Sequence, residues 1–273
     1  MPSPLILVVD KDKTLHNSLK TQLAEKKYEV ICTDDYNKAT YLVEKEKPRG
    51  IVADVDKDDL SWVECVKSKY TKPFIAMSKN NEASFLVELI KRNVFAFVHK
   101  PIFEDTLSDC LKCCIEFDDF EWNILSGFER WLEIEIPSNS NYINAYCSFI
   151  IHMMPEFKYK KMMEYAIKEL IQNAIEHGNK YREGSVVNIC FLKTPTLLMF
   201  MIKDQGTGFD MELLPHAVIG PQKKNPMDVL QYRKSMGMRP GGLGIHSVSR
   251  IADELIYNEK GNSVTMIKNI ANL

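Results

Sequence analysis

Polar and acidic side chains gather within one short apolar stretch, ELIQNAIEHGNK, from Glu169 to Lys180. Its apolar positions recur at the spacing of one helix face, which predicts an amphipathic helix. Glu169 and Asn173 lie four residues apart, so both side chains project from the same side of that helix. A carboxylate and an amide placed in this way can act together on one ligand, or they can belong to an ordinary solvated face. The stretch alone leaves both interpretations open.

Two glycine-containing stretches place further groups where a ligand can approach the backbone. KDQGTGFD has Asp204 at the end of an apolar strand, with Gly206 and Gly208 behind it. A buried carboxylate can accept a hydrogen bond from an adenine amino group, and adjacent glycines let a flat base come close to the backbone. RPGGLGIHSVSRIAD has glycines at the start of a predicted helix, where exposed N–H groups can bind phosphate. These glycines are Gly241, Gly242 and Gly244.

The last motif, GNSVTMIK, predicts a turn and a final strand that contains Thr265. The amide oxygen of Asn173 suits Mg²⁺, a hard cation that keeps several of its waters. Each motif alone is weak, because glycine-rich turns are common. Their order is a strong signal: a helix with Asn, a strand with DxGxG, a GxG before a helix, and a closing strand.

In this order the motifs resemble the Bergerat ATP-binding fold of gyrase, heat-shock chaperones and histidine kinases, over residues from about 128 to 273. Within that group, ELIQNAIEHGN and GGLGIHSVSRIADELIYNEKGNSVTMIK are most similar to the anti-sigma-factor serine kinases. The resemblance implies an α+β sandwich with ATP and Mg²⁺ as cofactors. It also implies a protein serine kinase.

The resemblance further implies a role for each motif residue. Asn173 would ligate the Mg²⁺ on ATP, and Glu169 would be the general base for a protein serine hydroxyl. Asp204 would hold adenine, with Thr265 as a candidate second contact. The other implied ATP contacts are Gly206, Gly208, Arg239, Gly242 and Gly244. A proline-, glycine- and lysine-containing segment from about Met211 to Pro240 is expected to be a mobile lid.

The first part of the chain alternates short apolar runs with helical patterns, five times in about a hundred residues. The runs are 5–9, 29–33, 50–55, 73–78 and 95–101. Short strands that alternate with helices predict an α/β doubly wound parallel sheet of five strands. In such sheets, functional residues gather at the carboxyl ends of the strands.

Acids, a hydroxyl and a lysine stand at those strand ends, namely Asp10, Asp12, Asp54, Ser78 and Lys100. Together they predict an acidic pocket with a hydroxyl and an ammonium beside it. This set resembles the receiver domain of response regulators, over residues 1 to about 118. The resemblance implies that Asp54 accepts a phosphoryl group, whose oxygens Ser78 and Lys100 contact. It also implies that Asp10 and Asp54 hold Mg²⁺.

The chain departs from the receiver pattern at Lys11, which stands where that family has a second acid. An ammonium cannot ligate a cation, and aspartyl phosphorylation needs a metal to screen charge. One interpretation is a phosphorylated receiver in which Asp12 supplies the missing acid. The other is a degenerate receiver that serves as a protein-docking module, with Lys11 in the place of the metal.

The length of 273 residues accommodates two domains. We expect a receiver domain over 1–118, a helical or irregular linker over 119–130, and an ATP-binding domain over 131–273. The net charge of −2 and the lack of a polybasic run argue against a nucleic-acid partner. No apolar run has the length of a membrane span and no signal peptide is evident, so we expect a cytoplasmic protein.

The cysteine content does not indicate a disulfide framework or a metal site. The odd number of seven cysteines fits reduced thiols. Cys110, Cys113 and Cys114 have helical spacing, but no second Cys or His pair nearby would complete a tetrahedral site. They are expected to be small apolar residues on a packing helix.

Together the two resemblances imply a signalling protein in which a receiver domain gates a Mg-ATP-dependent serine kinase. The implied partners are a STAS-domain anti-anti-sigma substrate, a sequestered sigma factor, an upstream histidine kinase and a second copy in a homodimer. Two alternatives stay open: a non-catalytic ATP-dependent binding switch, and a histidine-kinase relative. The latter needs a phosphoacceptor His on a helical hairpin, whereas His152 lies on a single predicted helix.

Overall fold

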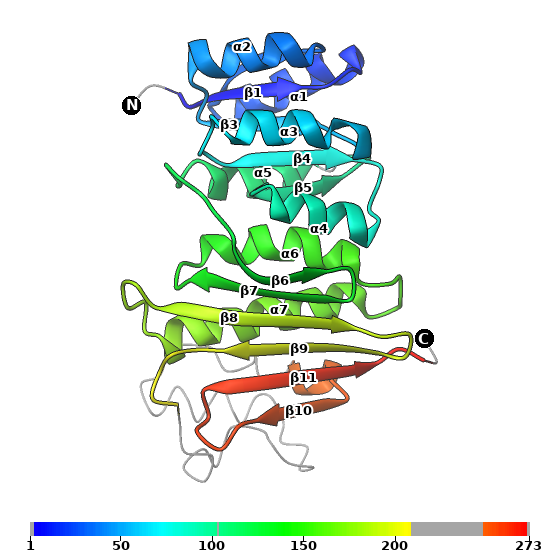
Figure 1. Cartoon of the computed structure of the whole chain (residues 1–273), viewed down its shortest axis with the longest axis vertical. Helices are drawn as coiled ribbons and strands as arrows, with labels where there is room; N and C mark the ends of the chain where they lie inside the picture. Colours follow the sequence, from blue (N-terminus) through cyan, green and yellow to red (C-terminus); the bar gives the residue numbers. More distant parts are fainter. Residues whose placement is uncertain (1–2, 103, 209–247, 272–273) are drawn as a thin grey trace. The chain divides into compact units, whose positions relative to one another are not determined.

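The computed structural model describes residues 3–102, 104–208 and 248–271. The chain divides into two compact units (Figure 1). Unit 1 comprises Met1–Trp122 and Asn144–Met153, and unit 2 comprises Asn123–Ile143 and Met154–Leu273. No helix in the described ranges combines the length and the apolar character that crossing a membrane requires.

Unit 1 is built on a five-stranded parallel sheet in the order β2-β1-β3-β4-β5. Its strands are β1 (Leu5–Val9), β2 (Glu29–Thr33), β3 (Gly50–Asp54), β4 (Phe74–Ser78) and β5 (Ala96–His99). Every residue of β4 is buried, because helices cover both faces of the sheet and leave no place for a polar alternation. The predicted doubly wound fold is confirmed.

The connecting helices are α1 (Lys13–Glu25), α2 (Tyr36–Glu46), α3 (Leu60–Lys67), α4 (Ala83–Lys91) and α5 (Glu104–Cys114). Several begin directly at strand-end acids. The Asp12 carboxylate accepts from the Thr14 amide at the start of α1, and the Asp35 carboxylate accepts from the Lys38 amide at the start of α2. These caps satisfy amides that a helix start leaves unpaired, so the acids fix where each helix begins.

Helix α6 (Asn141–Met153) belongs to unit 1 over residues 144–153. Ser148 Oγ accepts a 3.0 Å hydrogen bond from the backbone N–H of Phe97 in the edge strand β5. The Phe149 ring stacks on the Phe97 ring at 6.3 Å, and the His152 ring meets Phe97 edge-on at 5.2 Å. The helix therefore covers a sheet edge whose backbone groups would otherwise be open to other chains.

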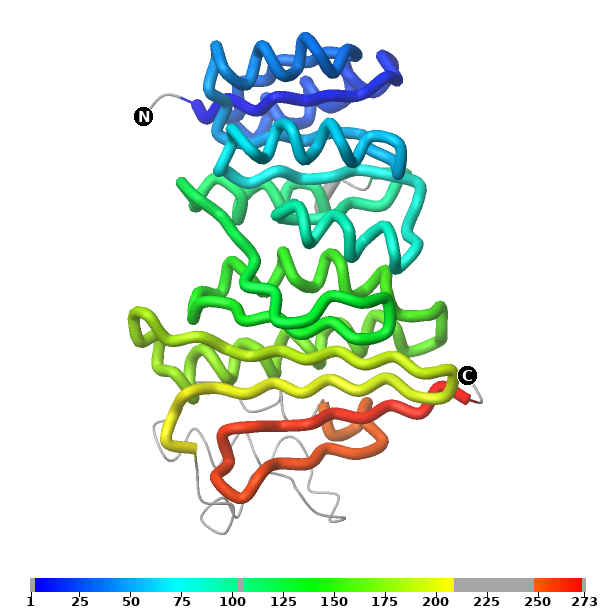
Figure 2. The backbone as a smooth tube through the Cα atoms, viewed as in Figure 1, coloured from blue at the N-terminus to red at the C-terminus, as the bar shows by residue number. Residues whose placement is uncertain are grey.

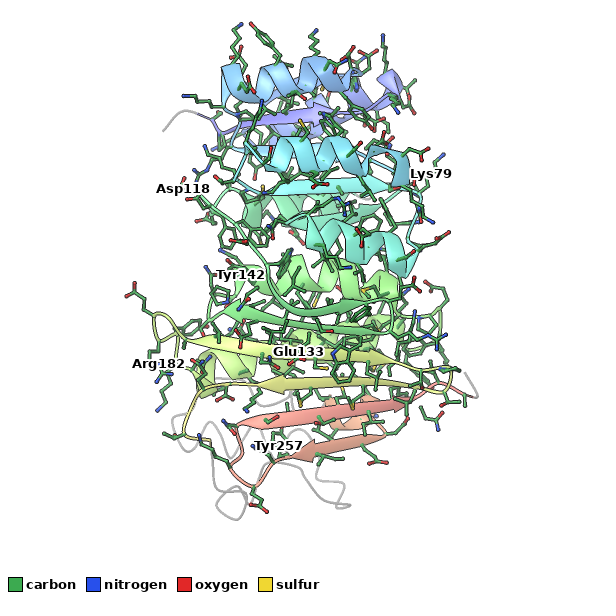
Figure 3. The ribbon with its side chains drawn as sticks, viewed as in Figure 1. Lys79, Asp118, Glu133, Tyr142, Arg182 and Tyr257 are labelled. Carbon is green, nitrogen blue, oxygen red and sulfur yellow. The ribbon has the colours of Figure 1, made fainter. Side chains whose placement is uncertain are left out.

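Unit 2 is built on a six-stranded antiparallel sheet in the order β10-β11-β9-β8-β7-β6 (Figure 2). Its strands are β6 (Asn123–Phe128), β7 (Trp131–Pro137), β8 (Val186–Lys193), β9 (Leu197–Lys203), β10 (Glu254–Tyr257) and β11 (Ser263–Asn269). Glu133 lies on β7 and Tyr257 on the edge strand β10 (Figure 3). Helix α7 (Lys160–Asn173) lies along one face of this sheet. The grouped strands and the separate helix agree with the predicted α+β architecture.

Two local features differ from the sequence-based expectations. The segment 119–130, expected to be a helical or irregular linker, contains strand β6, whose pairing with β7 is interrupted by a bulge after Ile124. All of its residues are exposed or half-buried. The sequence therefore lacks the alternation of buried apolar and exposed polar residues that would predict a strand. The stretch Glu169 to Lys180, predicted to be an amphipathic helix, is α-helical to Asn173 and then widens into a π-helical turn, Ala174–Gly178.

Replacing Phe149 by alanine should lower the free energy of unfolding of unit 1 by about 3–5 kcal/mol, because its ring is 1% exposed and its removal leaves a cavity. Denaturant unfolding followed by tryptophan fluorescence measures the loss, and hydrogen exchange over 96–99 locates it. The control is Tyr41→Ala, whose side chain is 59% exposed. Equal stability of the two variants would show that α6 is not part of the receiver core.

Candidate functional site

One face of helix α7 carries a line of polar side chains. Lys161, Tyr165, Glu169 and Asn173 follow at intervals of four residues and therefore lie one above the other. The charge of the Glu169 carboxylate raises the pKa of Tyr165, which stands one turn before it on the helix. Among the described residues, none is hydrogen-bonded to the Asn173 side chain. The half-buried Asn173 amide is thus available to a ligand.

The end of this helical segment makes a very close contact with the loop after β9. A Cβ atom on Gly178 would lie 2.3 Å from Asp204 Cγ, and a Cβ atom on Gly206 would lie 2.3 Å from the Gly178 carbonyl oxygen. Asp204 Oδ1 accepts a 2.7 Å hydrogen bond from the Gly206 amide, and burial raises the pKa of the Asp204 carboxyl. Only glycine at both positions lets the helix end and the carboxylate meet.

Two buried asparagines hold this contact in place, and sequence reasoning missed both. Asn179 Nδ2 donates to Ser138 Oγ at 2.7 Å and to the Val186 carbonyl at 2.8 Å. Its Oδ1 accepts from the Gln205 amide at 2.7 Å. Asn262 Nδ2 donates to the Asp204 carbonyl at 3.0 Å, and the Asp204 amide donates to the Asn262 carbonyl at 3.0 Å. Each asparagine directly follows a glycine of a predicted motif, Gly178 or Gly261. That position was the sequence feature that could have identified them.

The remaining predicted contacts fall into three groups. Gly208 has φ +73°, and a Cβ there would lie 1.8 Å from the Lys260 carbonyl oxygen, so the loop lies directly against the turn before β11. Thr265 alternates with the buried Val264 and Met266 and therefore lies on the opposite face of the sheet, where it is not brought to Asp204. Arg239, Gly242, Gly244 and the expected lid over 211–240 lie outside the described residues.

The residues that are brought together fit a magnesium nucleotide. A buried carboxylate in a glycine-lined contact suits the amino group of a flat base, and an available amide oxygen suits a hard cation that shares its other ligands with phosphates and water. Asn173 would hold that cation, and Asp204 the base. Glu169 is not needed for either task.

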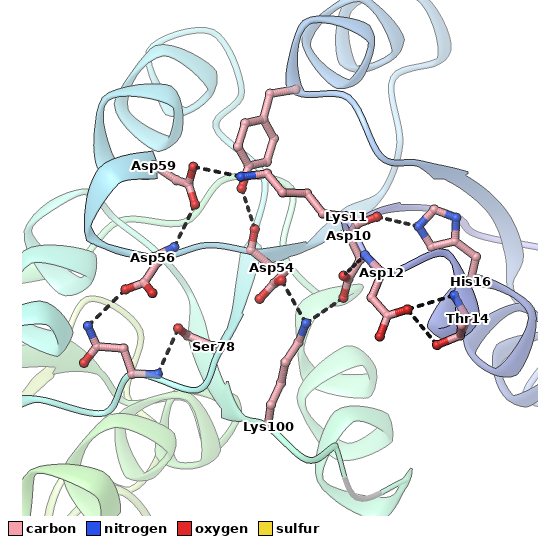
Figure 4. Close-up of polar contacts among 12 residues, drawn as sticks. Asp10, Lys11, Asp12, Thr14, His16, Asp54, Asp56, Asp59, Ser78 and Lys100 are labelled. Carbon is pink, nitrogen blue, oxygen red and sulfur yellow. Dashed lines mark hydrogen bonds and ion pairs between the residues drawn. The ribbon is translucent and has the colours of Figure 1, made fainter.

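A second polar cluster lies at the carboxyl ends of the strands of unit 1, as predicted, in a pocket of about 890 Å³. Lys100 Nζ lies 2.8 Å from Asp10 Oδ2 and 2.9 Å from Asp54 Oδ2 (Figure 4). Burial raises the pKa of Asp54, although Lys100 opposes the shift. Burial also disfavours the Lys100 charge, but its hydrogen bonds with both carboxylates leave the pKa of Lys100 raised. Ser78 lines the same pocket.

The two residues after Asp10 do not supply a metal ligand. Lys11 Nζ lies 3.7 Å from Asp59 Oδ1 and 4.9 Å from the centre of the Tyr36 ring. Asp12 Oδ1 accepts hydrogen bonds from the amide and the hydroxyl of Thr14, at 3.0 and 2.6 Å (Figure 4). Asp12 therefore caps α1 and does not take the place of the missing acid.

This donor set does not fit a divalent cation. Asp10 and Asp54 share one lysine, and Lys11 brings a second positive charge to the mouth of the pocket. Within the described parts of the chain, no three His, Cys, Asp or Glu side chains are arranged to hold a metal ion. The receiver pocket is thus neutralised by the protein's own cations.

The variant Gly178→Ala should weaken binding of a fluorescent ATP analogue at least about tenfold, because the new methyl group must displace the Asp204 carboxylate or the helix end. Fluorescence titration measures the affinity, and circular dichroism verifies the fold. The matched control is Gly184→Asn, since a Cβ at Gly184 meets nothing within 4 Å and asparagine tolerates its positive φ. If the folded Gly178→Ala protein binds the ATP analogue with unchanged affinity, Asp204 does not belong to the nucleotide site.

The variant Lys11→Asp should bind Mg²⁺ about tenfold more tightly than the native chain in the absence of nucleotide, because it restores a carboxylate ligand and removes a positive charge. Trp62, which stacks on Tyr36 at 4.3 Å, reports the titration by fluorescence. Lys13→Asp, an exposed change two residues away, is the control. If the native chain binds Mg²⁺ as tightly as Lys11→Asp does, the conclusion that the protein's own lysines neutralise the receiver pocket is wrong.

Comparisons with known proteins match both parts of the chain. A model of the response regulator receiver domain matches residues 6–112, and a model of the histidine kinase-like ATPase domain matches residues 151–268. The chain is 26% identical over 147 residues to the serine-protein kinase RsbW of Oceanobacillus iheyensis. That similarity covers 52% of this chain and 87% of the relative.

Solved structures similar to this chain include a response regulator from Thermotoga maritima, at 19% identity and a TM-score of 0.40, covering 42% of this chain and 99% of that one. Another is the chemotaxis response regulator CheY4 of Vibrio cholerae, at 21% identity and a TM-score of 0.38, covering 40% of this chain and 97% of that one. Together with the geometry of the two clusters, the sequence matches show a signalling protein in which a response regulator receiver domain is fused to a kinase-like ATPase domain related to RsbW.

Proposed function

We propose that this protein is a Mg-ATP-dependent serine kinase that phosphorylates a STAS-domain anti-anti-sigma protein and sequesters a sigma factor. The observation that carries the proposal is the line of side chains on α7, in which Glu169 stands one turn before the available amide of Asn173. A protein that only binds ATP needs Asn173 and Asp204, but it does not need a carboxylate at position 169. The similarity to a serine-protein kinase supports the same activity.

In the proposed reaction, each described residue has a separate task. Asp204, held by Gly178, Gly206 and Asn262, binds the adenine amino group. Asn173 holds the Mg²⁺, which when bound neutralises charge on the phosphates. Glu169 accepts the proton of the substrate serine hydroxyl as its oxygen attacks the γ-phosphorus and ADP leaves.

The receiver domain is proposed to gate this kinase. Two inputs are compatible with the fold: phosphorylation of Asp54 by an upstream histidine kinase, with Ser78 and Lys100 as the contacts of the phosphoryl group, or docking of a protein. The pairing of Lys100 with Asp10 and Asp54, together with Lys11 beside Asp59, favours docking, because the pocket already contains its counter-ions. The working form is proposed to be a cytoplasmic homodimer.

Replacing Glu169 by glutamine should lower phosphotransfer to serine by at least about a hundredfold, the usual contribution of a general base. ATP affinity should stay within about twofold, because no adenine or metal contact is removed. The test incubates the full chain and its variant with Mg-ATP and STAS-domain proteins from the same source, and maps phosphosites by mass spectrometry.

The matched control is Glu164→Gln on the same helix, whose carboxylate pairs with Lys168 at 2.8 Å and does not belong to the line of Glu169. It should phosphorylate at the native rate. If the native chain binds ATP and a STAS partner without forming phosphoserine, the protein is instead a non-catalytic nucleotide-dependent switch. Phosphohistidine on the chain itself would identify a histidine-kinase relative.

A further inference from the structure

A basic and aromatic pocket of about 680 Å³ lies at the start of helix α7 in unit 2. Helix α7 and the residue before it contribute most of its lining, the helical residues 248–251 contribute a cation, and the end of β11 contributes another. The residues used below are Tyr159, Lys161, Met162, Tyr165, Arg250 and Lys268. The residues predicted to contact adenine and the cation do not line this pocket, and Tyr165 is the residue that it shares with the surroundings of Glu169.

The pocket carries positive charge that the described residues do not neutralise. No acidic residue is among those described as lining it. Lys268 is paired, since its Nζ lies 2.8 Å from Asp253 Oδ1, and it stands 5.7 Å from the centre of the Tyr159 ring. Lys161 and Arg250 form no ion pair within the described ranges. Two cations therefore face the pocket without a carboxylate partner, so the pocket favours an anionic ligand.

The wall beside these cations is apolar and exposed. The Met162 side chain is 48% exposed and the Tyr165 side chain is 50% exposed. Exposed large side chains that adjoin a charged pocket are typical of protein-binding surfaces, where aromatic residues and methionine are enriched. A small inorganic anion would use the cations alone, whereas a peptide segment would cover both parts of the surface.

The pocket is aligned with the proposed phosphotransfer site. Tyr165 lies one turn before Glu169 and Lys161 lies two turns before it, on the same face of α7. With a rise of 1.5 Å per residue, Lys161 stands roughly 12 Å from Glu169 along the helix axis. An extended peptide advances about 3.3 Å per residue, so a carboxylate at Lys161 belongs to a residue roughly three or four positions from a serine at Glu169.

We propose that this pocket binds an acidic side chain of the protein substrate, three or four residues from the serine that is phosphorylated. Lys161 and Arg250 bind the carboxylate, and Met162 and Tyr165 contact the intervening residues. This assignment rests on the proposed function, because it names a recognition element of the substrate of the Glu169 site. It makes the kinase selective for acidic segments before any chemistry occurs.

The test measures peptide binding to the full chain without ATP, by fluorescence anisotropy at low and at physiological salt. Fluorescein-labelled eleven-residue peptides carry a central serine, with two aspartates either three and four residues before it or three and four residues after it. Matched peptides carry lysines at the same positions. One of the aspartate peptides should bind at least tenfold more tightly than its lysine counterpart, and added salt should weaken it.

The charge-reversed protein Lys161→Glu/Arg250→Glu should prefer the lysine peptide instead. The control is Arg130→Glu/Arg182→Glu, which changes the net charge by the same amount at exposed positions elsewhere in unit 2 (Arg182 is labelled in Figure 3). This control should keep the native preference for the aspartate peptide. The proposal that this pocket binds an acidic side chain is wrong if both peptide classes bind equally, if every peptide binds weakly, or if the control variant loses the preference for aspartate to the same extent. Failed phosphotransfer with intact charge-selective binding would instead overturn the role of Glu169 alone.

Discussion

The contact between Gly178 and Asp204 is the constraint on which the nucleotide-binding face depends. The two groups approach so closely that no side chain larger than hydrogen fits at Gly178, and the chain reaches this contact by widening its last helical turn. Because α7 is a rigid helix, fixing its end also fixes the height of Asn173 and Glu169 relative to the carboxylate of Asp204. One backbone contact thus sets the distance between the Asp204 carboxylate and the polar side chains of α7.

The two polar clusters of the molecule differ in whether their polar groups are already paired within the protein. In the receiver pocket, Lys100 neutralises Asp10 and Asp54, Lys11 lies beside Asp59, and Asp12 is used by the start of α1. On α7, the Asn173 amide has no hydrogen-bond partner among the described residues. A site that binds a charged ligand benefits from such unpaired groups, because a group that already has a partner within the protein must lose that partner before it can bind the ligand. The first cluster is therefore already paired within the protein, whereas the second leaves the Asn173 amide available to a ligand.

The sequence predicts the parts of the structure that a local pattern determines. The five apolar runs of the receiver and the spacing of Glu169 and Asn173 on α7 follow from local periodicity. The motif around Gly206 predicts room for a flat base, whereas the group that the structure brings against Gly206 is the Gly178 carbonyl. The edge strand β6 has no apolar alternation, so it depends on its pairing with β7. Asn179 and Asn262 gain their roles only when segments distant in sequence meet. The place of Thr265 opposite Val264 and Met266 shows that identifying a strand does not determine which face of the sheet a given residue occupies.

Helix α6 supplies the receiver unit with a segment that follows strands β6 and β7 of the other unit in the sequence. A fusion of two domains through one linker would cross between them once, whereas this chain crosses at 122/123, 143/144 and 153/154. Strand β5 carries Phe97, which bonds and stacks on α6, three residues before Lys100 of the receiver pocket. Phe97 and Lys100 thus belong to one short stretch of chain that packs on α6 and also lines the receiver pocket. The packing of the receiver unit therefore depends on a helix that the sequence places between β7 and α7 of the other unit.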